Sequence, residues 1–167
     1  MPQLPTTLRI PPHLKLNRSN NNTNALRLDG GSLTANGNWN DPNITYLVQD
    51  TVTVPVGKTL NVAAGQVVKF RDFGGLSLNV NGTLAVSGTV GQPVIFTSSR
   101  DDGVGGDTYN DTQGSLYAGQ WDHIQFSSTS TSNSMSFAQV RYGGANSTAS
   151  VIVNSAPLAM TNSTLKA

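Results

Sequence analysis

The chain has 167 residues, enough for one domain, and a formal net charge of +1 with only 11% charged residues. A chain this neutral has no electrostatic feature that favours nucleic acid, so nucleic acid is not expected as a partner. Cysteine is absent, which excludes disulfides and zinc sites built on thiolates. No apolar run approaches the roughly 18 residues that span a bilayer, so no membrane span is expected.

Residues 1–38 are predicted to form an irregular N-terminal arm or a cap that precedes the folded region at 39–167. Asn20 to Asn22 form a polar run, and four prolines interrupt any regular element: Pro2, Pro5, Pro11 and Pro12. Prolines also stand where a secretion signal would have its apolar stretch, so no signal peptide is visible.

Short apolar alternations begin after Tyr46 and continue along the chain. Gly, Asn or Pro separates one from the next, which is typical of strands bounded by turns. The strand signals are Val52/Val54, Leu60/Val62, Val68/Phe70, Leu76/Leu78/Val80, Leu84/Val86 and Val94/Phe96.

These strand signals recur in groups of three with a period of about 25 residues. Val52 to Leu78 is 26 positions, Leu60 to Leu84 is 24 and Val68 to Val94 is 26. The spacing returns downstream, in Ile124 to Val151 (27), Met135 to Leu158 (23) and Val140 to Leu165 (25).

A period of this length with three strands indicates an all-β, right-handed parallel β-helix, in which inward residues of successive coils stack in columns. An antiparallel sandwich is the alternative fold. The residues expected to be most buried are Leu60, Leu84, Val68, Val94, Phe96, Ile124, Phe126 and Val140.

One interruption of the period predicts a long inserted loop at residues 97–120. Val94 to Val140 and Leu78 to Ile124 each span 46 positions, one period plus about 21 residues. Insertions in solenoids form loops on one face, which is often the binding face. The loop is therefore the first candidate for a functional site.

The stretch from Tyr46 to Gly144 resembles right-handed parallel β-helix repeat segments of large bacterial secreted and surface proteins. The resemblance rests on TVTVPVGKTLNVAAGQVVKF, LNVNGTLAVSGTVGQPVIFTS, the Gly/Asp-rich loop, Trp121 and VRYGG at 140–144, with Trp39 ahead of the first strand. Such segments usually carry a Gly pair after the tryptophan, where this chain has Asp122 and His123. The resemblance implies an extracellular or cell-surface location and a non-catalytic modular role.

The inserted loop holds four of the nine acidic residues of the chain, interleaved with glycines. Ca²⁺ takes six to eight oxygen ligands from carboxylates, amides and carbonyls, which such a loop can supply. The predicted calcium ligands are Asp101, Asp102, Asp107, Asn110 and Asp111. A solvated loop whose Asp and Asn side chains stabilise turns is the alternative.

Two further groups of residues raise the question of catalysis. Asp122 and His123 are adjacent, and because neighbours on a strand point to opposite faces they are not expected to cooperate. Polysaccharide lyases and glycoside hydrolases also use the β-helix, with basic residues and carboxylates along a groove. The candidates for that role are Lys69, Arg71, Asp72, Arg100 and Arg141.

The function expected from the sequence is that of a non-catalytic extracellular structural or adhesion module that contacts a polysaccharide or another cell-surface ligand, with calcium stabilising the loop. A fragment of a polysaccharide lyase or glycoside hydrolase is the alternative. The period places Leu165 inward in the last coil, with nothing after Ala167 to cap it. Because bare solenoid ends recruit other chains, the chain is expected to be part of a longer protein or to pack end to end.

Overall fold

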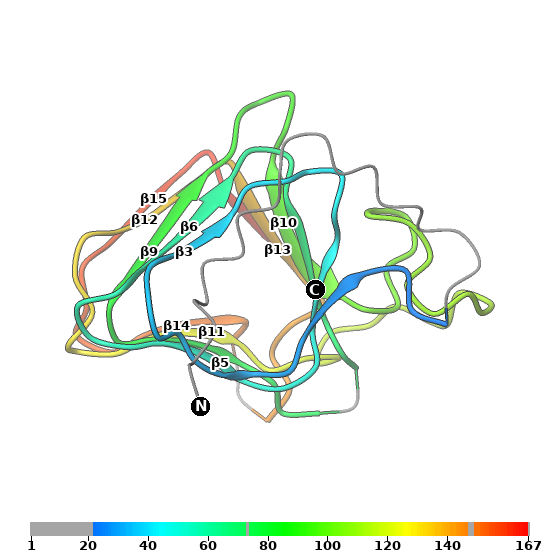
Figure 1. The fold of residues 1–167 in the computed structure, drawn as a ribbon, viewed down its shortest axis with the longest axis horizontal. Helices are drawn as coiled ribbons and strands as arrows, with labels where there is room; N and C mark the ends of the chain where they lie inside the picture. The colour runs from blue at the N-terminus through cyan, green and yellow to red at the C-terminus, as the bar shows by residue number, and fades with distance from the viewer. Residues whose placement is uncertain (1–21, 73, 147–148, 167) are drawn as a thin grey trace, which may run out of the picture.

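All regular structure in the computed structural model is β-strand, over the residues that it describes, 22–72, 74–146 and 149–166. Three parallel sheets form the sides of a triangular solenoid that the chain winds through in five coils (Figure 1). The predicted parallel β-helix with three strands per coil is confirmed. No helix in the described ranges has the length and apolarity needed to cross a membrane.

Each sheet takes one strand from every coil, so its strands are hydrogen-bonded in parallel to those of the coils before and after. Sheet A contains β1 (Leu26–Leu28), β4 (Tyr46–Val48), β7 (Val67–Phe70), β10 (Val94–Ser98), β13 (Ala138–Arg141) and β16 (Thr164–Lys166). Sheet B contains β2 (Gly31–Ser32), β5 (Val52–Val54), β8 (Leu78–Val80), β11 (Ile124–Phe126) and β14 (Val151–Val153). Sheet C contains β3 (Gly37–Trp39), β6 (Thr59–Ala63), β9 (Thr83–Ser87), β12 (Asn133–Ser136) and β15 (Leu158–Thr161).

The core is a set of apolar columns inside the triangle, because alternate residues of each strand point inward. All eight residues expected to be most buried are fully buried. Two pairs of stacked aromatic rings lie at corners between sheets. Trp39 stacks on Tyr46 with ring centroids 5.4 Å apart, and Trp121 lies parallel to Phe70 at 4.1 Å.

The predicted strand pairing is right in four of the six spacings and off by two residues in the others. Val68 pairs with Phe96 rather than with Val94, and Met135 pairs with Met160 rather than with Leu158. A shift of two residues keeps the same side chains facing inward, so alternation alone cannot distinguish the two registers.

The solenoid begins earlier than the predicted boundary at residue 39. Strands β1, β2 and β3 form a first coil that pairs with β4, β5 and β6. These strands have only two or three residues each, and the coil that follows supplies their hydrogen-bond partners. Such short strands show too little apolar alternation to be identified from the sequence. Residues 1–21 of the predicted arm lie outside the described residues.

The last coil leaves its inward side chains uncovered. Val153, Met160 and Leu165, one from each sheet, are 45%, 37% and 52% exposed. They continue three columns whose preceding members are fully buried. The end of the solenoid formed by β14, β15 and β16 therefore presents an apolar cross-section and unpaired strand edges.

Candidate functional site

The inserted loop, which connects β10 to β11, lies across the outer face of sheet A. Thr45 Oγ1 donates a hydrogen bond to the carbonyl of Gly105 at 2.8 Å, and Asn24 N donates one to the carbonyl of Thr108 at 2.8 Å. The outward residues Leu47 and Thr97 are consequently buried. Sheet A thus has no solvated face where the loop covers it, which explains the unbroken apolar runs Tyr46–Val48 and Val94–Phe96.

Lys69 points outward from β7 and is fully buried beneath the loop. Its ammonium group donates hydrogen bonds to the Gly106 carbonyl at 2.6 Å and to Thr108 Oγ1 at 2.8 Å. Asp102 Oδ1 lies 3.9 Å from Lys69 Nζ. Lys69 therefore joins the loop to the sheet and is the internal counter-ion of the acidic cluster, a role that the sequence pattern did not reveal.

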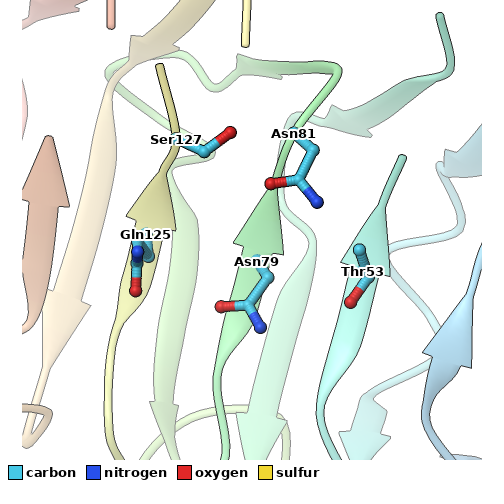
Figure 2. A pocket seen from close by; sticks show the side chains of 5 residues that line it. All are labelled: Thr53, Asn79, Asn81, Gln125 and Ser127. Carbon is cyan, nitrogen blue, oxygen red and sulfur yellow. The ribbon is translucent and has the colours of Figure 1, made fainter. Parts of the chain in front are cut away.

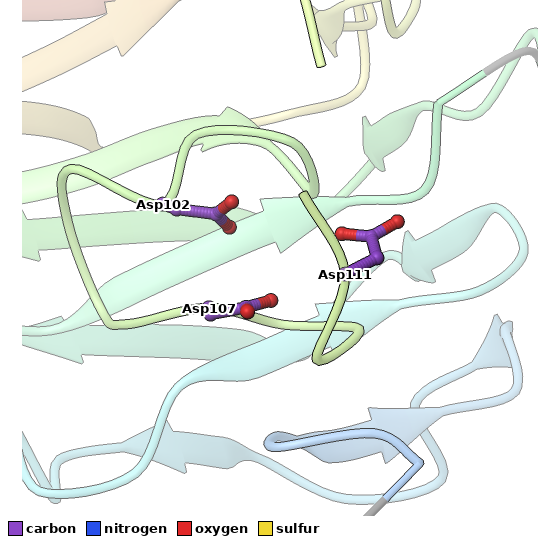
Figure 3. A group of neighbouring side chains, drawn as sticks. All are labelled: Asp102, Asp107 and Asp111. Carbon is purple, nitrogen blue, oxygen red and sulfur yellow. The ribbon is translucent and has the colours of Figure 1, made fainter. Parts of the chain in front are cut away.

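Three of the five predicted calcium ligands come together within the loop. Carboxylate oxygens of Asp102, Asp107 and Asp111 lie within 4.8 Å of one another. Figure 3 shows the three side chains converging from separate stretches of the loop. Carboxylates at this separation can share one hard cation.

The other two predicted ligands, Asp101 and Asn110, make contacts within the loop and with sheet A. Asp101 is buried, accepts a hydrogen bond from Thr97 Oγ1 at 2.7 Å and pairs with Arg141 at 3.3 Å. Asn110 has a positive φ of 59° and donates its backbone N–H to Asp107 Oδ1 at 2.8 Å.

The charges at the loop are held partly out of water. Burial, followed by the neighbouring charge of Asp107, raises the pKa of Asp102, although Lys69 acts in the opposite direction. Burial lowers the pKa of Lys69 to about 8, against the attraction of Asp102, Asp101 and Asp107. A raised carboxyl pKa means that the ionised cluster is costly, and a bound cation would offset this cost.

The charged residues considered for a polysaccharide-cleaving groove are held in separate contacts. Asp72 pairs with Arg100, Arg71 Nε donates to the Gln49 carbonyl at 3.1 Å, and Arg141 pairs with Asp101. Lys69 is buried beneath the loop, so each of the five side chains is engaged in a contact within the protein.

A shallow polar groove runs over the outer face of sheet B. Its lining comes from three neighbouring coils and is uncharged: Thr53, Asn79, Asn81, Gln125 and Ser127. Figure 2 shows these side chains standing on β5, β8 and β11 or directly after them. Thr53, Asn79 and Gln125 are register partners, so they form one row across the strands.

Asp122 and His123 lie close together beside this groove, contrary to the prediction. Asp122 Oδ1 is 2.9 Å from His123 Nδ1. Both residues precede β11, and the bend there removes the strand geometry that would turn neighbouring side chains to opposite faces. The other ring nitrogen, Nε2, is 3.0 Å from Gln125 Oε1 and 3.4 Å from Ser77 Oγ.

The groove was not predicted, although the sequence contains a signal for it. Asn79 follows Thr53 by 26 positions and Gln125 follows Asn79 by 46, the same spacings as the apolar residues beside them. Polar residues that keep the period must stack on the outer face, just as apolar residues stack on the inner face.

Comparison with known proteins found no matching family model, no similar curated protein and no similar solved structure.

Proposed function

We propose that this β-solenoid is a structural and adhesive module that binds a neutral, hydroxyl-rich polysaccharide along the outer face of sheet B. The observation that supports it is the uncharged groove of amide and hydroxyl groups. Such groups both donate and accept hydrogen bonds, as sugar hydroxyls do. The same sheet continues through five coils, so an extended ligand could follow it. An extracellular or cell-surface setting is part of the proposal and is supported by the sequence resemblance.

The binding test compares retention of the purified chain on insoluble neutral polysaccharides, cellulose, chitin and starch, with retention on pectate, which is acidic. Replacing Asn79 and Gln125 together by alanine is expected to weaken binding to the preferred neutral polymer about tenfold, as loss of roughly 1.4 kcal/mol of hydrogen bonding implies. Asn61→Ala is the matched control, since Asn61 is exposed on sheet C. Retention on none of the neutral polymers, or equal retention of the double variant, would count against the proposal.

The proposal includes a calcium ion held by Asp102, Asp107 and Asp111 that stiffens the inserted loop. Support comes from the convergence of the three carboxylates and from the raised pKa of Asp102, for which burial is the main cause. A cation that binds only the folded chain should stabilise it by about 2.7 kcal/mol at a hundredfold excess over the dissociation constant.

The calcium prediction is measured by calorimetry and by thermal unfolding with Ca²⁺ and with EDTA. The double variant Asp107→Asn, Asp111→Asn should lose both the binding heat and the stabilisation. Asp29→Asn is the control, because Asp29 is exposed and pairs with Arg27 outside the loop. Absence of heat together with an unchanged melting temperature would rule the site out.

The exposed end formed by β14, β15 and β16 is proposed to pack against another β-coil, which for the isolated chain is a second copy. Uncovered strand edges and apolar columns are the surfaces that solenoids normally cap. Light scattering over a concentration series should show an average mass that rises with concentration. Leu165→Lys should reduce this rise, whereas Val90→Lys should not, since Val90 is 89% exposed elsewhere. A chain that stays monomeric at high concentration would contradict the expectation.

A further inference from the structure

Ser77, His123 and Asp122 form a connected set of side chains at one end of the groove. Ser77 Oγ lies 3.4 Å from His123 Nε2, and His123 Nδ1 lies 2.9 Å from Asp122 Oδ1. Ser77 directly precedes β8 and His123 directly precedes β11, and Leu78 pairs with Ile124. The parallel register therefore brings the serine and the histidine face to face on the outer side of sheet B.

The carboxylate of Asp122 determines which ring nitrogen of His123 carries the proton. Asp122 Oδ1 and His123 Nδ1 are both buried and lie 2.9 Å apart, and neither atom makes a well-aligned hydrogen bond within the described residues. An unprotonated Nδ1 would place a lone pair against a carboxylate at 2.9 Å, which is repulsive. The proton therefore belongs on Nδ1, and Nε2 of the neutral ring is left as an acceptor.

An acceptor at Nε2 suits Ser77, which can donate its hydroxyl proton. Gln125 faces Nε2 with its amide oxygen at 3.0 Å, so this tautomer requires a half-turn of the Gln125 amide that brings its nitrogen to this position. The approach of Asp122 to Nδ1 is not a straight hydrogen bond. Hydrogen bonds of this kind are commonly long or poorly aligned before substrate binds and tighten afterwards.

We propose that this cluster hydrolyses carboxylic esters with a small acyl group, with Ser77 as nucleophile, His123 as general base and Asp122 as its positioning residue. A serine, a histidine and a carboxylate in this order form the arrangement that activates a hydroxyl for acyl transfer. The activity goes beyond the binding role proposed above and does not rest on it.

The reaction proceeds in two balanced steps. Ser77 Oγ attacks the ester carbonyl carbon while its proton passes to His123 Nε2, and the alcohol leaves with that proton. Water then attacks the acyl group on Ser77, giving its proton to His123 Nε2. Ser77 regains this proton as the carboxylic acid leaves, so the sum is ester plus water to acid plus alcohol.

The burial of Ser77 limits the size of the acyl group. Ser77 is only 5% exposed, so the proposal is restricted to esters with a short acyl group such as acetyl. The alcohol side of the ester would lie toward Asn79 and Gln125, which carry amide N–H donors along the groove. These neighbours favour an alcohol that bears further hydroxyl groups.

The test treats the wild-type chain with a fluorophosphonate that carries only short alkyl groups, bonds covalently to activated serines and meets the same size limit, and measures intact mass and the labelled peptide. One adduct on Ser77 is expected. Hydrolysis of p-nitrophenyl acetate should fall at least a hundredfold in Ser77→Ala and His123→Gln, as expected for loss of a nucleophile or a general base. Asp122→Asn should lower kcat with KM little changed.

Ser87→Ala is the control and should leave both readouts unchanged, because Ser87 is exposed at the end of β9 on sheet C. The labelling experiment uses the wild-type chain, so it tests the proposal even where a substitution prevents folding. A folded wild-type chain without an adduct on Ser77, or ester hydrolysis that survives Ser77→Ala, would overturn the proposal. Neither readout involves a polysaccharide, so failure here is separate from failure of the binding role.

Discussion

Replacing Leu84 by alanine is expected to lower the free energy of unfolding by about 2–5 kcal/mol. Leu84 is fully buried and is the register partner of Leu60 in the preceding coil. On its other side, its backbone N–H donates a hydrogen bond to the side chain of Asn133 at 2.9 Å. Neighbours on both sides restrict collapse of the cavity that alanine would leave, which places the cost in this range.

Urea unfolding followed by circular dichroism measures this cost. The transition midpoint should move to lower urea while the slope stays constant, since the surface exposed on unfolding changes little. Val90→Ala is the matched control and should change stability by less than about 0.5 kcal/mol, because Val90 lies at the surface. Equal costs for the two variants would show that Leu84 is not a core residue.

Replacing Lys69 by alanine is expected to cost about 3–5 kcal/mol and to release the inserted loop from sheet A. The change removes the ammonium group that binds the Gly106 carbonyl and Thr108 Oγ1. It also leaves Asp102 and the buried Asp101 without this neighbouring cation. Removing one charge of a buried pair destabilises a protein by more than the intact pair stabilises it, because the remaining charges stay desolvated without their partner.

Stability of the Lys69→Ala variant is read from urea unfolding in EDTA, and loop release from the rate of proteolysis within residues 100–115. Lys69→Met removes the charge but keeps most of the packing volume. Its comparison with Lys69→Ala therefore separates the effect of the charge from that of the methylene groups. Lys166→Ala is the control, because Lys166 is exposed on the last strand of sheet A. A Lys69→Ala chain as stable and as protease-resistant as Lys166→Ala would show that Lys69 does not hold the loop.

The sequence predicted only part of the candidate site. The density of aspartate and glycine identified the loop, but not that Asp101 would turn inward to Arg141 while Asp102, Asp107 and Asp111 converge. That choice depends on contacts between segments far apart in the chain. Lys69 was considered as a surface or catalytic residue because a lysine beside a strand signal is usually solvated.

The sequence by itself determined the architecture: parallel strands, three per coil, apolar residues inside and one long insertion. It could do so because a stacked coil imposes the same in-and-out pattern on every turn, and this pattern is local and repeated. Tertiary structure alone decided the register within a sheet, the first coil at Leu26–Trp39, the burial of Lys69 and the meeting of Ser77 with His123. Each of these depends on which residues of separate coils face one another. A two-residue shift leaves the pattern unchanged, so only packing of the whole solenoid selects among the alternatives.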